Sequence, residues 1–270
     1  MLNDLNFNDF ISEPFVAAHM STKYVPIDNF NGFHKKVSDV VLFGINNLNE
    51  YLSTHERIKL MYLSLENRQE IKSSGIQYSS LKTRSPFLLF TKEFFELSGA
   101  KFKTLRRRIN NFKNRKIEIK DAPNSFQEFE LFLKEWKNQR QHAHFQIYIG
   151  YDKNFYQKYL PIWKDRLIAK FFYLDGILEG YSIIEKVSPG CYNLLFHKAN
   201  PNHEGFCLYM DFKMWEYIYN LEQDDFVVNM GSDSNEKGLL HYKTKSFPVE
   251  QRIFELYELT IKNLNVEGQV

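Results

Sequence analysis

The stretch LIAKFFYLDGILEGYSIIEK (residues 167–186) predicts a β-hairpin and is the clearest fold signal in the chain. Two apolar runs flank Asp175 and Gly176, and an Asp-Gly pair in this setting is a strong signal for a two-residue turn between antiparallel strands. The segment CYNLLFHKA (191–199) follows a Pro-Gly pair and predicts a third strand. These residues therefore indicate an antiparallel sheet in the second half of the chain.

Beyond these strands the pattern changes to alternating helices and strands. Residues 201–221 carry apolar side chains at helical spacing, and FVVNMG (226–231) predicts a buried strand. A short helix at 238–245 and a closing strand at 249–259 complete the order. Because antiparallel strands precede one strand–helix–strand unit, we predict an α/β or α+β fold with a mixed, mostly antiparallel sheet flanked by helices.

The first half of the chain carries weaker signals of the same kind. Residues 57–65 and 85–91 predict strands, and the mixed apolar spacing of 33–53 predicts one or two helices. Ser125 with Glu128 three residues later matches a capping box and predicts the start of a further helix. The first half therefore also combines strands and helices.

The composition and the first residues limit the classes of protein to which this chain could belong. The 270 residues include 35 basic and 33 acidic side chains, a net charge of +2 that excludes a strongly basic or acidic protein. Cys191 and Cys207 lack disulfide or metal spacing. The first residues do not resemble a signal peptide, and no apolar run approaches the roughly 20 residues of a membrane span. We therefore expect a cytoplasmic protein.

A basic segment stands out against this near-neutral charge. Residues 101–120 hold nine Lys or Arg side chains and one acid, Glu118. Apolar residues recur there at spacings of 3, 4 and 3, which predicts a helix with one buried stripe. The stripe consists of Phe102, Leu105, Ile109 and Phe112.

The arginines of this helix fall around the flanks and far side of the stripe. Arg106, Arg107 and Arg108 could bind a substrate phosphate, or they could form an ordinary solvated face. A third interpretation is a nucleic-acid patch, although aromatic side chains suited to base stacking are confined to the buried stripe.

A first candidate site is the loop before the predicted helix 201–221. Gly205 lies where that helix begins, and the N–H groups at a helix N-terminus can bind an anion such as a pyrophosphate. One glycine is a weak signal, so a plain strand–helix loop is the alternative.

A second candidate site follows the strand at 226–231. The strand leads into Asn229, Gly231 and Asp233, sites in open sheets form beyond such strand ends, and Asp233 could accept a proton or orient an amine. His241 is a second candidate acid or base, and Lys243 and Lys245 could neutralise phosphates. The alternative is a solvated loop with surface lysines.

Metal and nucleotide motifs are missing from the sequence. His142 and His144 form a pair without the further Cys, Asp or Glu ligands of a familiar zinc set, so we expect no metal site. Walker, G-x-G-x-x-G and G-x-S-x-G patterns are also absent, which argues against the commonest NTPases, dinucleotide enzymes and hydrolases.

Two stretches resemble a known family, and the resemblance extends over roughly residues 80–260. They are FLLFTKEFFELSGAKFKTLRRRINNFKN (87–114) and VNMGSDSNEKGLLHYKTKSFPVE (228–250). The positions that match the family pattern are Gly99, Lys101, Phe102, Arg107, Ile109, Asn110, Phe112, Asn229, Asp233, Gly238, Leu239, Lys245, Ser246 and Phe247. On these residues the chain resembles the phosphatidylglycerol lysyltransferase C-terminal-like family, which is similar to the FemABX transferases.

The resemblance implies two tandem lobes of the GCN5-related N-acetyltransferase (GNAT) fold. On that basis we expect a degenerate N-terminal lobe at 1–100, a basic connecting helix at 101–120 and a catalytic lobe at 121–262, followed by a tail at 263–270.

The resemblance also implies an acyltransferase or aminoacyltransferase that works by direct attack of an amine or hydroxyl on an activated carbonyl. The donor would be acyl-CoA, an acyl-carrier protein or an aminoacyl-tRNA, and the acceptor a small molecule, a lipid or a peptide. A non-catalytic nucleic-acid-binding or scaffold protein on a degenerate GNAT fold is the alternative.

Residue roles follow from the same resemblance. The expected catalytic residues are Asp233, His241 and Asn229. The residues expected at the donor are Asn202, His203, Glu204, Gly205, Phe206, Lys243 and Lys245.

Overall fold

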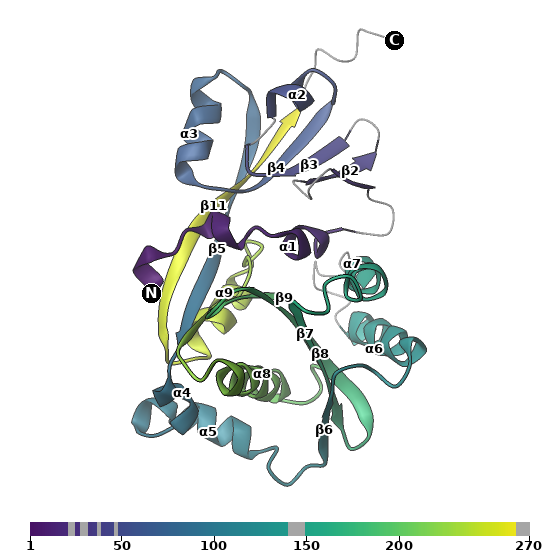
Figure 1. Cartoon of the computed structure of the whole chain (residues 1–270), viewed down its shortest axis with the longest axis vertical. Helices are drawn as coiled ribbons and strands as arrows, with labels where there is room; N and C mark the ends of the chain where they lie inside the picture. The colour runs from purple at the N-terminus through teal and green to yellow at the C-terminus, as the bar shows by residue number, and fades with distance from the viewer. Residues whose placement is uncertain (21–24, 28–31, 37–38, 46–47, 140–148, 263–270) are drawn as a thin grey trace.

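The computed structural model describes residues 1–20, 25–27, 32–36, 39–45, 48–139 and 149–262 (Figure 1). Eleven strands in these residues form one sheet in the order β1-β2-β3-β4-β11-β5-β10-β9-β8-β7-β6. The strands are β1 (Val25–Pro26), β2 (Gly32–Lys36), β3 (Asp39–Phe43), β4 (Arg57–Leu63), β5 (Tyr78–Phe90), β6 (Ile117–Lys120), β7 (Leu167–Leu174), β8 (Ile177–Ser188), β9 (Cys191–Ala199), β10 (Phe226–Asn229) and β11 (Glu250–Lys262).

Helices cover both faces of this sheet. The α-helices are α1 (Glu13–Ala17), α2 (Leu48–Leu52), α3 (Leu65–Ser73), α4 (Lys92–Glu96), α5 (Lys103–Asn110), α6 (Phe126–Gln139), α7 (Ile149–Asn154), α8 (Phe206–Glu222) and α9 (Lys237–Lys245). Short 3-10 turns form at η1 (Leu2–Asp4), η2 (Phe7–Phe10) and η4 (Ala100–Phe102), and a π-helical turn at η6 (Phe155–Tyr159) continues α7.

The second half of the chain confirms the predicted hairpin and strand–helix–strand unit. β7 and β8 pair antiparallel around Asp175 and Gly176, which take φ values of 54° and 87°. Positive φ at both turn residues matches the right-handed twist of the strands, and Asp-Gly tolerates it. β9 pairs antiparallel with β8 and parallel with β10, and α8 makes the crossover between β9 and β10.

The last strand joins the two halves of the sheet. β11 lies between β4 and β5 and pairs antiparallel with both. Figure 1 shows β5 and β11 as two long neighbouring strands that run from the upper half of the molecule to the lower half. β11 is therefore central to the sheet, although it comes after all the other described strands in the sequence.

Side chains along each strand alternate between the two faces of the sheet, so part of the hydrophobic core lies on each face. Phe87 of β5 packs with η1, η2 and α1, whereas its neighbour Leu88 packs with α4, α5 and α8 on the opposite face. Successive side chains of a strand point to opposite faces, so one strand serves both layers. Further clusters lie beneath α6 and α7 and beneath α2 and α3.

Two sequence expectations need correction. Residues 33–53 contain one of the expected helices, the short α2 at Leu48–Leu52, but Phe33 lies in β2 and Val40–Phe43 in β3, so most of the described part of this range is strand. β-branched Val40 and Val41 pair with β4 in a parallel ladder, and that pairing outweighs the mixed helical spacing. The basic helix also ends earlier than residue 120, because α5 stops at Asn110 and Ile117–Lys120 pairs with β7 as β6.

The apolar stripe and the capping residues match their predictions. Phe102, Leu105, Ile109 and Phe112 are all buried in the cluster that includes α8. The Glu128 N–H donates to Ser125 Oγ at 3.1 Å, and the Glu128 carboxylate accepts the Asn124 N–H at 2.9 Å. The sequence pattern therefore predicted the buried face of α5 and the N-terminal cap of α6 correctly.

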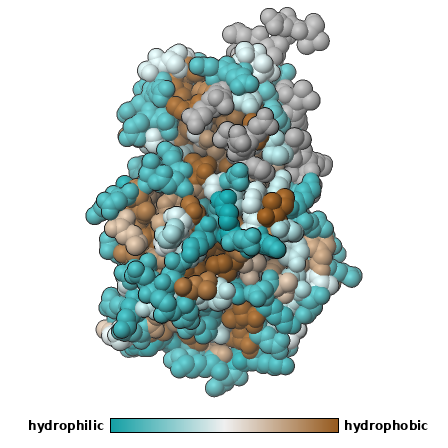
Figure 2. Space-filling model, in the orientation of Figure 1, coloured by the Kyte–Doolittle hydropathy of each residue, from teal (hydrophilic) through white to brown (hydrophobic). Residues whose placement is uncertain are grey.

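Exposed apolar side chains are scattered over the surface. On the face drawn in Figure 2, hydrophobic residues are interspersed with hydrophilic ones. None of the helices in the described residues is long and apolar enough to cross a lipid bilayer.

Candidate functional site

A cleft opens where β9 and β10 stop pairing. The parallel ladder joins Cys191–Asn193 to Val227–Asn229, after which β9 continues to Ala199 while the chain beyond β10 turns toward α9. The cleft has a volume of about 630 Å³ and is walled by the free edge of β9 and by residues of α6, α7, α8 and α9. This volume is within the usual range of ligand sites.

The lining of the cleft is mainly apolar, with a few polar groups. Trp136, Tyr151 and Phe196 supply aromatic surface, and Lys198 and Lys243 supply amines. A smaller hollow of about 170 Å³ adjoins it and shares Leu194, Met230 and Lys243. The combination of an apolar wall with a few polar groups is typical of small-molecule sites.

The loop before α8 lies against the basic helix α5. Gly205 is the N-cap of α8 with φ of 82°. A Cβ built on Gly205 would lie 3.8 Å from Cβ and 3.9 Å from Cγ of Arg108. The structure thus brings together Arg108 and the loop that the sequence assigned to donor phosphates, and Figure 1 shows α5 beside α8.

The other two arginines differ from Arg108. The Arg106 guanidinium donates to the carbonyl oxygens of Leu97 and Gly99, which follow the last turn of α4. Arg107 is exposed to solvent. Of the three candidates, Arg108 is therefore the one that the structure places against the loop.

Glu179 contacts two residues of the loop before α8. Its carboxylate accepts from Asn200 Nδ2 at 2.6 Å and lies 3.3 Å from His203 Nε2. The Asn202 N–H donates to Asn200 Oδ1 at 3.0 Å. Asn202 and Glu204 have exposed side chains, whereas the Phe206 side chain is buried in the core.

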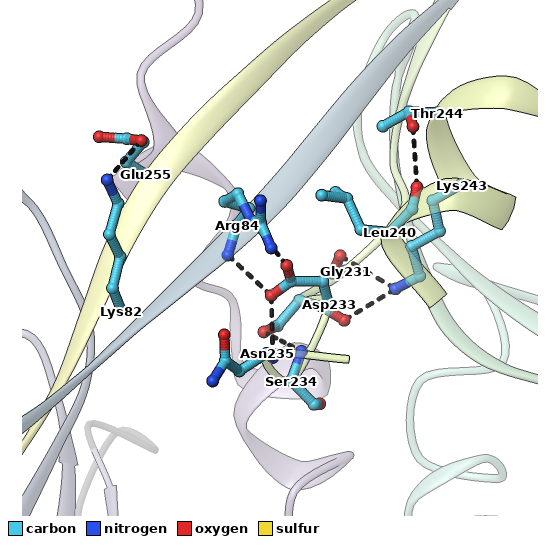
Figure 3. A network of polar contacts seen from close by, with 11 residues as sticks. Lys82, Arg84, Gly231, Asp233, Ser234, Asn235, Leu240, Lys243, Thr244 and Glu255 are labelled. Atoms are coloured by element: carbon cyan, nitrogen blue, oxygen red, sulfur yellow. Dashed lines mark hydrogen bonds and ion pairs between the residues drawn. The ribbon is translucent and has the colours of Figure 1, made fainter. Parts of the chain in front are cut away.

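Asp233 is buried and engaged on both carboxylate oxygens (Figure 3). Oδ1 accepts the N–H groups of Arg84 and Asn235 at 2.9 and 3.0 Å, and Oδ2 accepts Arg84 Nε at 2.8 Å. These contacts tie the segment after β10 to β5. They support a structural role, and the expected role as a base stays a prediction.

Asn229 lies in a second buried polar network. Its Oδ1 accepts from Ser85 Oγ at 2.8 Å and from the Gly231 N–H at 3.0 Å, and its Nδ2 donates to Asn193 Oδ1 at 2.9 Å. Its amide is therefore used to hold β5, β9 and β10 together where the cleft begins.

Lys243 lies in the cleft wall and donates to two backbone carbonyls. Its Nζ is 3.0 Å from Gly231 O and 2.9 Å from Ser232 O, as Figure 3 shows for Gly231. Burial lowers the pKa of Lys243 to about 7, although Asp233 and Asp211 act in the opposite direction. His241 and Lys245 are exposed and are not among the described residues that line the cleft.

The lowered pKa of Lys243 makes stability depend on pH. Its pKa is about 7 in the folded state and about 10.4 in an unfolded chain. Between these values the unfolded state binds more protons, so unfolding free energy should rise with pH by up to about 1.4 kcal/mol per pH unit. Urea unfolding at several pH values across this window should show a smaller slope for Lys243→Met, and an unchanged slope for the exposed Lys245→Met. Equal slopes in both variants would contradict the assignment.

Other cleft residues were not identified from the sequence. Lys198 Nζ donates to the buried Asp152 carboxylate, which also accepts the Tyr181 hydroxyl, and Lys198 lies 5.2 Å from the centre of the Trp136 ring. Lys198 lies within the segment 191–199 that predicts a strand, and nothing in its local pattern indicates a partner 46 residues away. The pair of His142 and His144 lies outside the described residues.

Comparison with known proteins places this chain in a family. The family described as "Phosphatidylglycerol lysyltransferase, C-terminal" matches residues 45–267. The chain belongs to this family. The phosphatidylglycerol lysyltransferase C-terminal family is named for a transferase, in agreement with the resemblance found in the sequence. A search of curated protein sequences gave no match.

Solved structures support the same fold. L-PGS from Bacillus licheniformis is 14% identical with a TM-score of 0.60, over 95% of this chain and 90% of that one. FemX is 11% identical with a TM-score of 0.55, over 97% and 98% of the two chains. A tandem GNAT protein from the clavulanic acid biosynthesis pathway is 8% identical with a TM-score of 0.56, over 90% and 85%. The predicted GNAT-like fold class, with a mostly antiparallel sheet flanked by helices, is confirmed for this member of the lysyltransferase family.

Proposed function

We propose that this protein transfers an acyl or aminoacyl group from an activated donor to an amine or hydroxyl acceptor in the cleft between β9 and β10. The observation that carries the proposal is the separation of these two parallel strands. Along β9 from Leu194 to Ala199, the backbone N–H and C=O groups that face away from β8 are left without β10 as a partner, beside a cavity of about 630 Å³. An extended chain that carries an activated carbonyl could pair with this edge.

The donor's phosphates would lie at the start of α8. No side chain of the described residues caps α8, and the Phe206 N–H donates to the His203 carbonyl at 3.0 Å, so the N–H groups of the next two residues are the ones without an acceptor within the helix. These N–H groups and the positive end of the helix dipole favour an anion. Arg108 beside Gly205 adds a formal positive charge. Acyl-CoA, an acyl-carrier protein and an aminoacyl-tRNA all carry phosphate near the activated group.

The acceptor would enter from the aromatic side of the cleft. Trp136 and Tyr151 offer apolar surface there, and Lys198 with Asp152 offers a polar pair. This arrangement suits an amphipathic acceptor with an amine or hydroxyl, such as a lipid headgroup or a peptide. The family name and the L-PGS relative are consistent with a lipid acceptor.

The proposal is tested by a screen of donors against the whole protein. Thermal shifts with acetyl-CoA, long-chain acyl-CoAs and aminoacyl-tRNAs report binding, because a ligand that binds only the folded state raises apparent stability. Mass spectrometry then follows donor consumption with lipid and peptide amines or hydroxyls as acceptors. If none of the donors shifts the melting temperature and none is consumed, the transferase proposal is wrong.

Arg108→Gln is expected to weaken donor binding about tenfold, because a charge-assisted contact to phosphate contributes roughly 1.5 kcal/mol or more. The dissociation constant of the donor found in the screen is the measurement. Lys103→Gln, on the exposed surface of the same helix, removes the same formal charge and should change affinity much less. Equal losses in the two variants would mean that α5 acts only through its overall charge.

A further inference from the structure

A cluster of reactive side chains lies in the cleft wall. It does not include Arg108 of the proposed phosphate site. Cys207 is the second residue of α8 and lines the cleft. Its Sγ is 3.0 Å from His197 Nε2. On the other side of the ring, His197 Nδ1 is 2.5 Å from Ser182 Oγ and 3.5 Å from Asp211 Oδ1. The imidazole thus forms hydrogen bonds with a thiol and with a hydroxyl, and the Asp211 carboxylate lies nearby as a charge whose Oδ1 has no hydrogen-bond partner among the described residues.

Four elements hold this cluster in place. Ser182 of β8 and His197 of β9 are directly paired across the ladder. Cys207 and Asp211 are one helical turn apart on α8, so their side chains lie on the same face. Tyr242 of α9 donates its hydroxyl to Asp211 Oδ2, which orients the buried carboxylate. Because each group is held by packing and hydrogen bonds, the arrangement is pre-organised.

The charges favour a protonated ring. Burial alone would lower the pKa of His197, but Asp211 and Cys207 together raise that pKa to about 9. Burial raises the pKa of Asp211, and His197, the Tyr242 hydroxyl and Lys243 oppose that rise. A ring protonated on both nitrogens donates from Nδ1 to Ser182 Oγ and from Nε2 to the sulfur of Cys207.

The order of groups matches an activated nucleophile. A nucleophile, a base in hydrogen-bond contact with it and a third group that orients the base form the recurrent arrangement of covalent acyl transfer. Here these are Cys207, His197 and the Ser182 hydroxyl at Nδ1. The sulfur, one ring nitrogen and one Asp211 oxygen also lie within 4.8 Å of one another, so a metal ion such as zinc is the competing occupant of the cluster.

We propose that Cys207 is a catalytic nucleophile that accepts the acyl group of the donor as a thioester, with His197 as its acid and base and Asp211 and Tyr242 as positioning residues. This proposal rests on the proposed transferase function and replaces direct attack with two steps. The Cys207 thiol lines the cleft at the start of α8, next to the expected donor phosphates, where it can reach the carbonyl of the donor.

The two steps balance as follows. The Cys207 thiolate attacks the donor carbonyl, the bond from that carbon to the leaving oxygen or sulfur breaks, and the leaving group takes the proton from His197. The acyl group is then a thioester on Cys207 and the ring is neutral. The acceptor amine or hydroxyl attacks the thioester, its proton passes to His197, and the carbon–sulfur bond breaks to regenerate the thiolate beside the imidazolium.

A first experiment tests the thiol without any donor. Cys191 is the internal reference, because both cysteines are free and partly exposed. In the whole protein at neutral pH, iodoacetamide should alkylate Cys207 at least about tenfold faster than Cys191, since His-paired thiols react as thiolates. Peptide mass spectrometry measures both rates in one sample. His197→Gln should remove most of the difference. Equal rates in the wild-type protein, or stoichiometric zinc bound at the cluster, would overturn the proposal.

A second experiment uses the donor that the wild-type protein consumes. Intact-mass analysis of a rapidly quenched reaction should show an adduct of one acyl group that neutral hydroxylamine removes. Cys191→Ala should keep the adduct and the rate, while Cys207→Ala, checked for an unchanged melting temperature, should lose the adduct and at least about 100-fold in rate. Full turnover by Cys207→Ala overturns this proposal alone. If the wild-type protein consumes no donor, the proposed transferase function fails as well.

Discussion

An Asp233→Ala variant is expected to lose about 3 kcal/mol of unfolding free energy. Its carboxylate is fully buried and accepts two backbone N–H groups and the Arg84 guanidinium. Alanine would leave these donors without their acceptor, including a charged one that is only partly exposed. Urea unfolding followed by circular dichroism should show a clearly lower midpoint.

The neighbouring ion pair between Lys82 and Glu255 provides a matched control. It also involves β5, which it joins to β11, but its side chains are 49% and 57% exposed, and Figure 3 shows it beside the Asp233 network. Glu255→Ala should cost less than about 1 kcal/mol, as is usual for exposed pairs. If Asp233→Ala costs no more than this control but abolishes transfer, the contacts are not structural and Asp233 acts as the base.

Leu259→Ala is expected to destabilise the protein by a similar amount, about 3 kcal/mol. Leu259 is fully buried in β11, opposite Leu60 of β4, and packs in the cluster beneath α2 and α3. The smaller side chain leaves a cavity between the two strands that a closely packed core cannot fill completely. The change in unfolding free energy, measured by urea titration, tests whether the C-terminal strand is an integral part of the core.

Ile253→Ala is the control within the same strand. Ile253 pairs with Pro86 of β5, but its side chain is 41% exposed. The loss should stay near or below about 1 kcal/mol, because less apolar surface is removed from the core. Equal losses at residues 253 and 259 would mean that β11 does not occupy the central position described.

The sequence identified the elements of the second half with good accuracy because their signals are local. Asp175 and Gly176 determine the hairpin through their own backbone preferences, and the apolar stripe of α5 follows from helical spacing. The strands at residues 33–53 were not predicted, because the interactions that decide them lie between strands rather than within one local segment. β3 is stabilised by its parallel ladder with β4, and a ladder cannot be recognised from the spacing within one strand.

The candidate site was only partly predictable for the same reason. The loop at Gly205 and the segment after β10 were identified because sites commonly follow strand ends and helix starts. The contacts of Asp233 with Arg84, and of Lys198 with Asp152, were not predictable. The spacing of Cys207 from Cys191 gave no sign of a site, because the partner of Cys207 is His197 of β9, which in turn lies near Asp211.

The sequence by itself determined the hairpin turn, the helix periods and caps, the family signature and hence the fold class. Only the tertiary structure decided that β11 lies between β4 and β5, that Asp233 and Asn229 are held in buried networks, and that Cys207, His197 and Asp211 meet in the cleft wall. Turns and helices depend on interactions between residues a few positions apart, which one sequence displays directly. Strand order and side-chain partners depend on packing between segments far apart in the chain, and local patterning does not encode that choice.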